Sequence, residues 1–355
     1  MKPTLQTVAD AVGVSRSTVS NAYSRPDQLS LKLRNKILEA ARQLGYTGPD
    51  PTARSLRSGR VGAIGVLLAP TVSYAFADPY AVDFMRGLTE SAESRETGVL
   101  LLPLKDDDDA ALAAVQSAAV DGFCVYCVPG WFRLLEAVWA RGLPIVNASF
   151  EADDPDALFV GIDEAAAARA IGRHVVALGH RRIAVIGHYV GPDQTSGPVS
   201  GPDLDEVPSY VSRERFRGYR DAFAEAGVAW SDVVTINAAG NSRHDGAVAA
   251  AHALDRAPRP TAVLAITDML ALGTLDALAA RGLRPGHDVS VAGFDDIPDA
   301  AIAQLTTIRQ SAIERGRIAG ELLIDPPADP GERHVVLPTE LIVRASTGPA
   351  QEGSI

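Results

Sequence analysis

The chain has 355 residues, of which 46% are hydrophobic and 22% are charged, and its formal net charge is −11 at pH 7. This composition is typical of folded globular proteins, and the length suffices for two or three domains, which excludes a disordered chain. No apolar run approaches the roughly 18 residues of a membrane-spanning helix, so we expect no membrane partner.

Charge is distributed unevenly along the chain. Residues 1–60 carry ten Lys and Arg against four Asp and Glu, whereas the remaining residues carry 23 against 40. A basic segment on an acidic body is typical of a protein in which one small module meets a polyanion. The first residues pass directly into an amphipathic pattern without the apolar region of a secretory signal, so we expect a cytoplasmic protein.

The first two predicted helices have the layout of a helix-turn-helix. Thr4 can cap a helix with apolar residues on one side, and Gly13 can adopt the left-handed conformation that ends it. Ser15 then caps a second helix after a short turn. This pattern predicts a small DNA-binding headpiece.

The second helix carries the side chains that we expect to read DNA. At about 100° per residue, Val19, Ala22 and Tyr23 fall on one side, and the opposite side is polar. Arginine can bond guanine, asparagine can bond adenine and serine can bond either, which suits a major groove; a solvated surface helix is an equal alternative on this helix alone. The candidate DNA-binding residues of the headpiece are Thr4, Ser15, Arg16, Ser17, Thr18, Ser20 and Asn21.

A third helix is predicted between a cap at Ser30 and Gly45, which completes a headpiece over residues 1–48. Residues 49–60 then form a hinge, in which Pro51 marks the start of a helix of about eight residues. A helix that short is unstable in water by itself, so it must form against another surface.

The hinge has the composition of a minor-groove wedge. Leu56 is an apolar side chain between Arg54 and Arg57, and such a leucine can pry open a base step while the arginines contact phosphates. The alternative is an ordinary linker whose leucine docks on the body. We include Arg54, Leu56 and Arg57 among the candidate DNA-binding residues.

From residue 61 onward, apolar runs alternate with helical patterns. Continuous apolar runs predict parallel sheets covered on both faces, and their number favours two sheets with a break near residues 159–165. Ligands of such folds bind beyond the carboxyl ends of the strands, so a cleft between the two lobes is the expected pocket. The predicted strands lie within residues 61–69, 98–104, 123–128, 143–149, 182–187, 233–237, 261–267 and 288–295.

Two motifs that could indicate metal binding have simpler interpretations. Cys124 and Cys127 lie three apart in a predicted buried strand, so they point to opposite faces and are interpreted as core residues. The acidic run at residues 106–109 precedes a helical pattern, where it suits the helix dipole. We therefore expect no metal site.

The stretches TLQTVADAVGVSRSTVSNAYSRPDQLS and EAARQLGYTGPDPTARSLRSGR, together with the body, resemble the lactose-repressor/galactose-repressor family of bacterial transcription regulators. The resemblance implies an α-helical helix-turn-helix headpiece and an α/β two-lobed, periplasmic-binding-protein-like core with parallel sheets over residues 61–355. The lobes would span about 61–160 and 161–305, with the chain crossing back near 305–325. It also implies that Arg16, Ser17 and Asn21 face bases and that Leu56 intercalates.

The same resemblance implies the residues that bind an effector. They stand in the elements DPYAVDFMRG, RERFRGY, AITDMLALG and VAGFDD, after predicted strands. A buried arginine facing an aspartate across a cleft can hold a polyhydroxylated ligand by charge-assisted hydrogen bonds; a helix cap or a surface ion pair is the alternative for each residue alone. The candidates are Tyr80, Ala81, Arg215, Thr267, Asp268 and Asp295.

The stretch between residues 189 and 210 is rich in Gly, Pro and Asp. It either shapes the pocket or is a mobile insertion, and its composition favours mobility.

No nucleotide-binding loop, nucleophile elbow or zinc-protease motif is present, so we expect neither enzymatic activity nor a cofactor. A small-molecule carrier and a sugar-processing enzyme are the alternatives; the first has no use for residues 1–60 and the second needs paired carboxylates across the cleft.

We predict a dimeric transcriptional repressor that binds double-stranded operator DNA and a small-molecule effector, a sugar or a related metabolite. A tetramer stays open.

Overall fold

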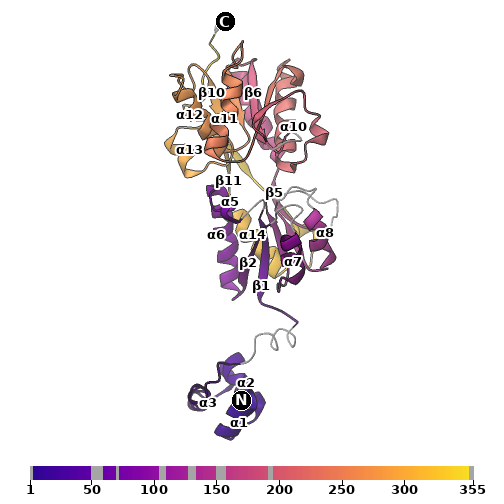
Figure 1. Ribbon diagram of the computed structural model, residues 1–355, viewed down its shortest axis with the longest axis vertical. Coiled ribbons are helices and arrows are strands. Elements are labelled where there is room, and N and C mark those ends of the chain that lie inside the picture. The colour runs from indigo at the N-terminus through magenta and orange to yellow at the C-terminus, as the bar shows by residue number, and fades with distance from the viewer. Residues whose placement is uncertain are drawn as a thin grey trace. The chain divides into compact units, whose positions relative to one another are not determined.

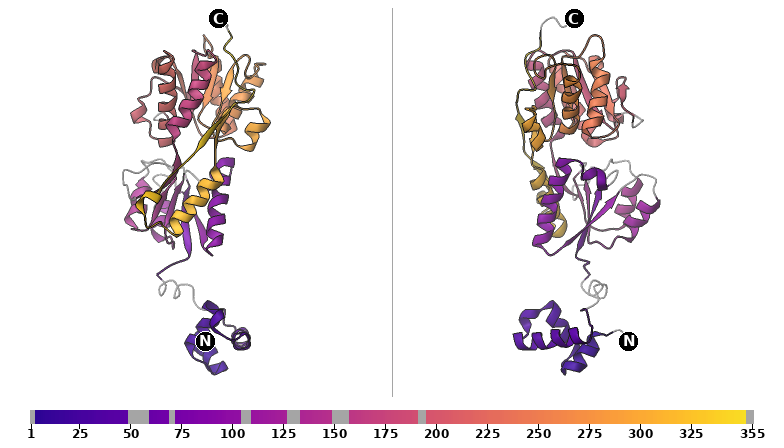
Figure 2. Two further views of the ribbon diagram at one scale, coloured as in Figure 1. Left: turned by 180° about the vertical axis from the view of Figure 1, so that it is seen from behind. Right: turned by 60° about the vertical axis from the view of Figure 1, so that its left-hand side comes forward.

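The computed structural model describes residues 3–48, 59–68, 72–103, 109–126, 133–148, 157–190 and 195–351 (Figures 1 and 2). The chain divides into two compact units, Met1–Gly62 and Ala63–Ile355. None of the helices within these described ranges has the length and apolar character needed to cross a membrane.

The described part of the first unit is a helical headpiece with its own small core. Each α-helix begins at a side-chain cap, because Thr4, Ser15 and Ser30 accept hydrogen bonds from backbone N–H groups in the first turn. Gly13 ends the first helix at a φ of 78°, as predicted. The elements are α1 (Leu5–Val12), α2 (Arg16–Ser24), the 3-10 turn η1 (Pro26–Gln28) and α3 (Leu31–Gln43), around buried Val8, Ala9, Val12, Val19, Ala22, Ile37 and Ala41.

The first lobe of the second unit contains a parallel sheet with the strand order β12-β5-β4-β3-β1-β2. Its strands are β1 (Ala63–Leu68), β2 (Gly98–Pro103), β3 (Phe123–Tyr126), β4 (Ile145–Asn147), β5 (Leu158–Ile162) and β12 (His334–Leu337). Its helices are α5 (Val72–Ala75), α6 (Pro79–Ser94), α7 (Asp109–Ser117), α8 (Arg133–Ala140) and α14 (Ala312–Ile324).

The second lobe contains a sheet with the order β10-β9-β6-β8-β7. Within the described part of this sheet, β7 pairs antiparallel with β8 and the other pairs are parallel. Its strands are β6 (Ile183–His188), β7 (Gly197–Val199), β8 (Val234–Ala238), β9 (Ala262–Ala265) and β10 (Ser290–Ala292). Its helices are α9 (Glu164–Ala177), α10 (Tyr210–Glu225), α11 (Arg243–Leu254), α12 (Asp268–Ala279) and α13 (Pro298–Ile302), with the 3-10 turns η2 (Leu204–Glu206) and η3 (Trp230–Asp232).

The described chain passes between the lobes at three places. β5 ends in the first lobe and α9 begins in the second, while β11 (Thr307–Gln310) and β13 (Thr339–Ile342) form an antiparallel pair between the two sheets (Figures 1 and 2). β12, which follows the 3-10 turn η4 (Pro330–Glu332), pairs with β5 at the edge of the first sheet. The predicted two-lobed α/β core with parallel sheets is confirmed. The chain passes from the first sheet to the second after β5.

The stretch from 195 to 210 corrects the interpretation that favoured mobility. β7 pairs with β8, and both Leu204 and Val207 are buried in the main core. The amide of Asn237 donates to the carbonyl of Thr195 at 2.8 Å. Two inward apolar side chains therefore anchor a stretch whose Gly and Pro content alone resembled an insertion; residues 191–194 lie outside the described ranges.

Helices α6 and α14 pack so closely that their glycines cannot carry a side chain. A Cβ atom on Gly87 would lie 1.8 Å from the carbonyl oxygen of Ile313, and one on Gly316 would lie 1.9 Å from that of Phe84. We expect Gly87→Ala to lower the free energy of unfolding by about 1–3 kcal/mol, because the two backbones must move apart. Chemical denaturation measures this change.

Gly197→Ala is the matched control, because nothing lies within 4 Å of a Cβ at Gly197 and its φ is not positive. It should change the stability by less than about 0.5 kcal/mol. Equal effects of the two substitutions would contradict the close packing of α6 and α14.

Candidate functional site

The amino end of α2 presents a polar surface on the headpiece. Arg16 and Ser17 are exposed and Asn21 is half-buried. The hydroxyl of Ser15, which caps the helix, lies 2.7 Å from that of Ser17 and 2.8 Å from that of Thr18. These short donors and acceptors, at the positive end of a helix dipole, suit contacts with phosphates and base edges.

Ser20 differs from the predicted arrangement. It is 9% exposed, so it belongs to the packed side of α2 and not to its polar side. The reason is that α2 contacts α1, α3 and η1, so that more of its surface is covered than the apolar residues alone predict, and Ser20 lies within the covered part. Thr4 caps α1 and its hydroxyl lies 3.1 Å from that of Thr7. Arg54, Leu56 and Arg57 lie outside the described residues.

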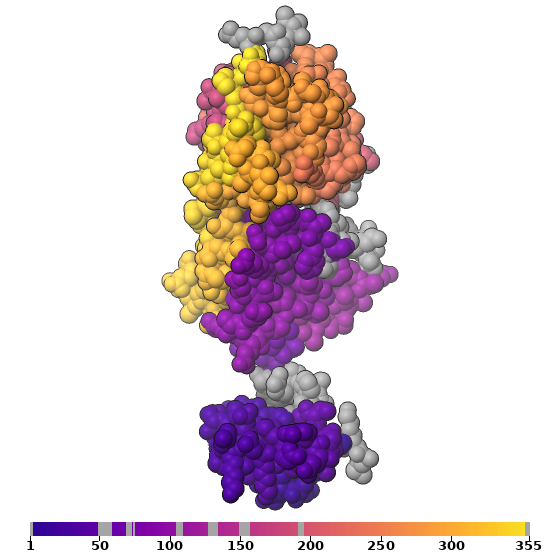
Figure 3. Space-filling view, turned by 90° about the vertical axis from the view of Figure 1, so that its left-hand side faces the viewer, coloured from indigo at the N-terminus to yellow at the C-terminus, as the bar shows by residue number. Residues whose placement is uncertain are grey.

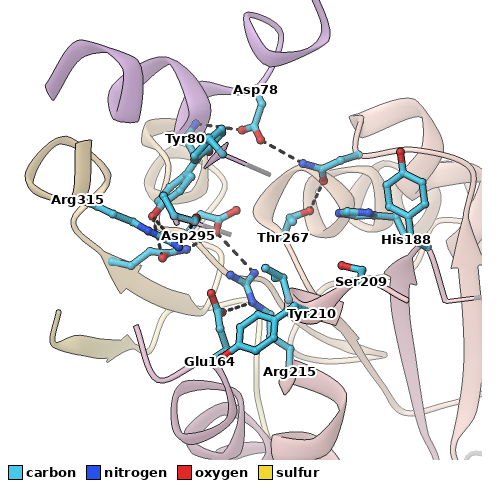
Figure 4. Close-up of a pocket in the computed structure, with 16 residues that line it drawn as sticks. Asp78, Tyr80, Glu164, His188, Ser209, Tyr210, Arg215, Thr267, Asp295 and Arg315 are labelled. Atoms are coloured by element: carbon cyan, nitrogen blue, oxygen red, sulfur yellow. Dashed lines mark hydrogen bonds and ion pairs between the residues drawn. The ribbon is translucent and has the colours of Figure 1, made fainter. Parts of the chain in front are cut away.

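A pocket lies between the two lobes of the second unit and encloses about 710 Å³ of space, including its opening to solvent (Figure 4). Both lobes contribute to its wall, as expected for the carboxyl ends of parallel strands. The lining residues are Asp78, Tyr80, Tyr126, Ala148, Glu164, His188, Tyr189, Ser209, Tyr210, Val211, Arg215, Asn241, Thr267, Asp295, Gln310 and Arg315.

Arg215 is the centre of a buried charge cluster. Its Nε atom donates to Glu164 at 2.7 Å, its Nη1 atom donates to the carbonyl of Ile266, and Nη1 lies 3.8 Å from Asp295 Oδ1. The guanidinium lies 3.5 Å from the centroid of the Phe294 ring. All three side chains are less than a tenth exposed, and Arg215 and Glu164 compensate each other's charge. Burial raises the pKa of the Asp295 carboxyl well above its usual value, although the charge of Arg215 opposes this.

A hydrogen-bonded chain runs from the first lobe to the second. Arg315 Nη1 donates to the hydroxyl of Tyr80 at 3.3 Å, Tyr80 donates to Gln310 Oε1 at 2.9 Å, and Gln310 Nε2 donates to Asp295 Oδ1 at 2.7 Å. Arginine can only donate, so it fixes the direction of every later bond and the orientation of the Gln310 amide. Burial raises the pKa of Tyr80 to about 12, so its hydroxyl keeps the proton.

A second link joins the lobes near the amino end of α6. Asp78 caps α6 by accepting from Tyr80 N at 3.0 Å, and it also accepts from Asn241 Nδ2 of the second lobe at 3.2 Å. The hydroxyl of Thr267 donates to Oδ1 of the same Asn241 side chain at 2.5 Å. Asn241 therefore ties the first lobe to α12.

Four of the six predicted effector-binding residues meet in this pocket: Tyr80, Arg215, Thr267 and Asp295. Ala81 and Asp268 do not line it. Ala81 is 2% exposed on the packed side of α6. Asp268 is fully buried behind the pocket, where it accepts from Thr307 Oγ1 at 2.6 Å and from Ile297 N at 3.0 Å.

The buried carboxyl of Asp268 should make stability depend on pH. Burial raises its pKa to about 7, against the hydrogen bonds from Thr307 and Ile297. The folded protein therefore keeps a proton on Asp268 that the unfolded chain releases above about pH 4. The contribution of this proton to the free energy of unfolding is complete below about pH 4 and is lost as the pH rises from about 4 to about 7. We expect the free energy of unfolding to fall over this range more steeply in the wild type than in Asp268→Asn.

Urea unfolding at a series of pH values measures both proteins. Asp268→Asn is informative because the amide cannot titrate, although it weakens the contact with Ile297 N. Parallel pH profiles of the two proteins would show that Asp268 does not hold this proton.

Several lining residues were not predicted. Arg315 had a detectable signal, because it occupies the side of α14 that also carries buried Ala312 and Ala319, where a charged residue needs partners. Its hydrogen bonds go to Tyr80 and to the carbonyls of Val160 and Ala148. The others gave no local signal; they are Asp78, Tyr126, Ala148, Glu164, His188, Val211, Asn241 and Gln310, with Tyr189, Ser209 and Tyr210 from the stretch that was interpreted as mobile.

Comparison with protein families assigns both parts of the chain. Residues 4–48 match the family of bacterial regulatory proteins, lacI family, and residues 173–347 match the periplasmic binding protein-like domain. An HTH-type transcriptional regulator of Mycobacterium tuberculosis is 39% identical over 350 residues, which cover 98% of each chain.

Solved structures agree with this assignment. A LacI-family transcriptional regulator from Corynebacterium glutamicum has a TM-score of 0.73 and 31% identity, and the match covers 98% of this chain and 99% of that one. The complex of the transcriptional regulator CelR with cellobiose has a TM-score of 0.68 and 26% identity, and covers 97% of this chain and 99% of that one.

Proposed function

Because the chain belongs to the LacI family of helix-turn-helix transcriptional regulators, we propose that it is a sequence-specific repressor under the control of a small-molecule effector. The effector, a sugar or a related metabolite, binds between the lobes of the core and changes the affinity of the headpiece for its operator. The supporting observation is that the same chain carries a polar surface on α2 and a cleft in which hydrogen bonds join the two lobes. The bound cellobiose of CelR agrees with this ligand class.

The proposed domains follow the sequence pattern. Residues 1–48 form the headpiece, residues 49–60 form the hinge and residues 61–355 form the effector-binding and dimerisation core. The Asp, Arg and Thr side chains of the cleft supply both donors and acceptors, which a polyhydroxylated ligand requires. No catalytic role is proposed for any of them.

We also propose that the protein is a homodimer that pairs through one face of its core. The helices α5, α6 and α13 lie along the same side of the core, and Figure 3 shows this face. Phe76, which follows α5, Val82 of α6 and Ile302 of α13 are large apolar side chains that are exposed in a single chain, Phe76 to 56% and Ile302 to 82%. A twofold contact through this face would bury them and bring two headpieces to a near-palindromic site.

The double variant Val82→Glu, Ile302→Glu should separate the dimer, because like charges would meet across the twofold axis. We expect the wild type to sediment at about twice the mass of the 37.3-kDa chain and the variant to sediment as a monomer at micromolar concentration. Trp139→Glu is the control, since Trp139 is also a large exposed apolar side chain but belongs to α8, on the other side of the first lobe. A monomeric wild type, or a variant that stays dimeric, would refute this interface.

The test of the proposed function is reciprocal binding. An operator is first selected from randomised duplexes, and its affinity is measured by fluorescence anisotropy with and without candidate sugars. An effector that changes operator affinity must have its own affinity changed by the same factor when operator is present. Equal effector affinity in the presence and absence of operator would exclude the allosteric function.

A further inference from the structure

The last part of the described chain, which we call the tail segment (residues 344–350), returns to the second lobe after β13. Figure 3 shows the end of the described chain, in yellow, along the surface of this lobe. The hydroxyl of Ser346 donates to the carbonyl of Val291 in β10 at 2.6 Å, and the amide of Ala350 donates to the carbonyl of Leu178 after α9 at 2.8 Å. The tail segment therefore attaches one of the three crossings between the lobes to the second lobe.

Two histidine side chains of the second lobe contact the tail segment. His174 Nε2 lies 2.9 Å from Oγ1 of Thr347, and His180 Nε2 lies 2.9 Å from the carbonyl oxygen of Gly348. His180 is 2% exposed and His174 is half-buried. Both imidazoles therefore lie in the contact between the tail segment and the lobe, and neither lines the pocket between the lobes.

The hydrogen bonds of His180 identify the nitrogen that carries its hydrogen atom. A carbonyl oxygen can only accept, so Nε2 donates to Gly348. In the neutral ring Nδ1 then accepts, and the hydroxyl of Thr261 at 2.9 Å donates to it. The carbonyl of Arg182 lies 3.2 Å from the same hydroxyl but already accepts from Thr261 N at 2.8 Å. In its neutral form, His180 therefore has a partner at each ring nitrogen.

A positive charge on either ring is unfavourable while the tail segment is attached. Burial lowers the pKa of His180, and the charges of His174 and Arg181 lower it further, against the bond to Gly348. Burial also lowers the pKa of His174. Two protonated rings would in addition repel each other across the attachment.

The other charged groups on the elements around the two rings have partners of their own. Gly286, in the turn before β10, packs against Gly348 of the tail segment, so the charged side chains of that turn belong to this set. The pairs are Arg173 with Glu225, Arg284 with Asp288, His287 with Asp288, and Arg344 with Asp296, while Arg181 and Arg182 donate to backbone carbonyls. These carboxylates are bonded to arginines, so they do not offset a charge on His174 or His180.

The directions of the two pKa shifts determine how the attachment depends on pH. An imidazole whose pKa in the attached state lies below the ordinary 6.5 binds its proton more readily once the tail segment is released. The attachment is therefore complete above about pH 6.5 and weakens as the pH falls through the lowered pKa values. Asp268 has the opposite effect on the stability of the whole protein, because its pKa is raised.

We propose that the tail segment is a pH-sensitive latch, which stays closed while His174 and His180 are neutral and opens when they are protonated. Release of residues 344–350 leaves β13 without its attachment to the second lobe. Acidification therefore loosens one of the three crossings between the lobes. The latch lies outside the pocket, so it acts whichever effector binds there.

Hydrogen exchange of the full chain at pH 7.5 and pH 5.5, followed by mass spectrometry, tests the latch. Each rate is divided by the intrinsic rate at that pH, and the tail segment is compared with the core strand β6. We expect the opening equilibrium of the tail segment to rise at least about tenfold on acidification, because each proton contributes up to about tenfold per pH unit, while β6 stays protected. Unchanged exchange of the tail segment, or equal loosening of β6, would overturn the proposal.

The double variant His174→Gln, His180→Gln removes both titrating rings and keeps a donor and an acceptor at each position. We expect exchange of its tail segment to change by less than about threefold between the two pH values. His252→Gln, at an exposed position on α11, is the control and should respond like the wild type. A double variant with the wild-type response would refute the role of the histidines.

His174→Gln alone keeps the test valid if the double variant does not fold, because His174 is only half-buried. It should lose the share of one proton and keep that of His180, so its response should lie between those of the wild type and of a chain without either ring. An undiminished response of this single variant would exclude His174 from the latch.

Discussion

Arg215→Ala should abolish the response to effector while the headpiece still binds operator. The substitution removes the guanidinium that pairs with Glu164 and contacts the Phe294 ring, and it leaves the Glu164 carboxylate, whose side chain is 2% exposed, without its cation. Breaking a buried pair in this way costs about 3–5 kcal/mol, so the second lobe is destabilised as well as deprived of a ligand contact. Operator anisotropy with and without a bound sugar measures the response.

A double variant separates the loss of the ligand contact from the loss of stability. Glu164→Gln, Arg215→Met removes both charges, so it should recover much of the free energy of unfolding that Arg215→Ala loses. It should not recover effector binding, since the guanidinium of Arg215 is still missing from the wall of the cleft. If the double variant responds to effector like the wild type, Arg215 acts only through stability.

Local features of the fold were predictable because they depend on neighbouring residues. Thr4, Ser15 and Ser30 cap their helices, and Gly13 ends α1, by interactions within one turn. The buried strands were also predictable, since parallel strands covered on both faces are continuously apolar. β2 is an edge strand in which exposed and less exposed residues alternate, yet its apolar run is equally clear in the sequence.

The cleft was predictable in part only, because its contacts join residues that are remote in sequence. The bond from Tyr80 to Gln310 spans 230 positions, and that from Asn241 to Asp78 spans 163. Residues after strand ends could be placed near the cleft by the general rule for parallel sheets, as for Thr267 and Asp295. Gln310 ends β11, which crosses between the lobes. Its hydrogen bonds to Tyr80 and Asp295 form only when the two lobes have packed together.

The stretch before α10 shows how composition can mislead. Its Gly and Pro residues are typical of mobile loops, but Leu204 and Val207 enter the core. Two apolar positions among many polar ones suffice to order it, because each buried side chain contributes about 1.5–3 kcal/mol. The consequence is functional, since this stretch delivers Ser209 and Tyr210 to the pocket.

Leu56→Ala is expected to weaken operator binding by roughly 100-fold or more, while the affinity of the free protein for effector stays unchanged. The sequence around Leu56 predicts a helix of about eight residues between Pro51 and Gly59, too short to be stable alone. If this helix forms against the minor groove, the leucine side chain inserts into a base step, and its loss removes that contact in both copies of a dimer. Anisotropy on the selected operator and calorimetry with a bound sugar measure the two affinities.

Ser55→Ala is the control, because it changes the neighbouring side chain in the same segment without removing an apolar group. Its operator affinity should stay within about threefold of the wild type. The salt dependence adds a second criterion: Arg54 and Arg57 remain in Leu56→Ala, so the slope of log affinity against log salt should be unchanged while the affinity falls. An unaltered operator affinity for Leu56→Ala would mean that the hinge leucine is a linker residue that docks on the body, and not a wedge in DNA.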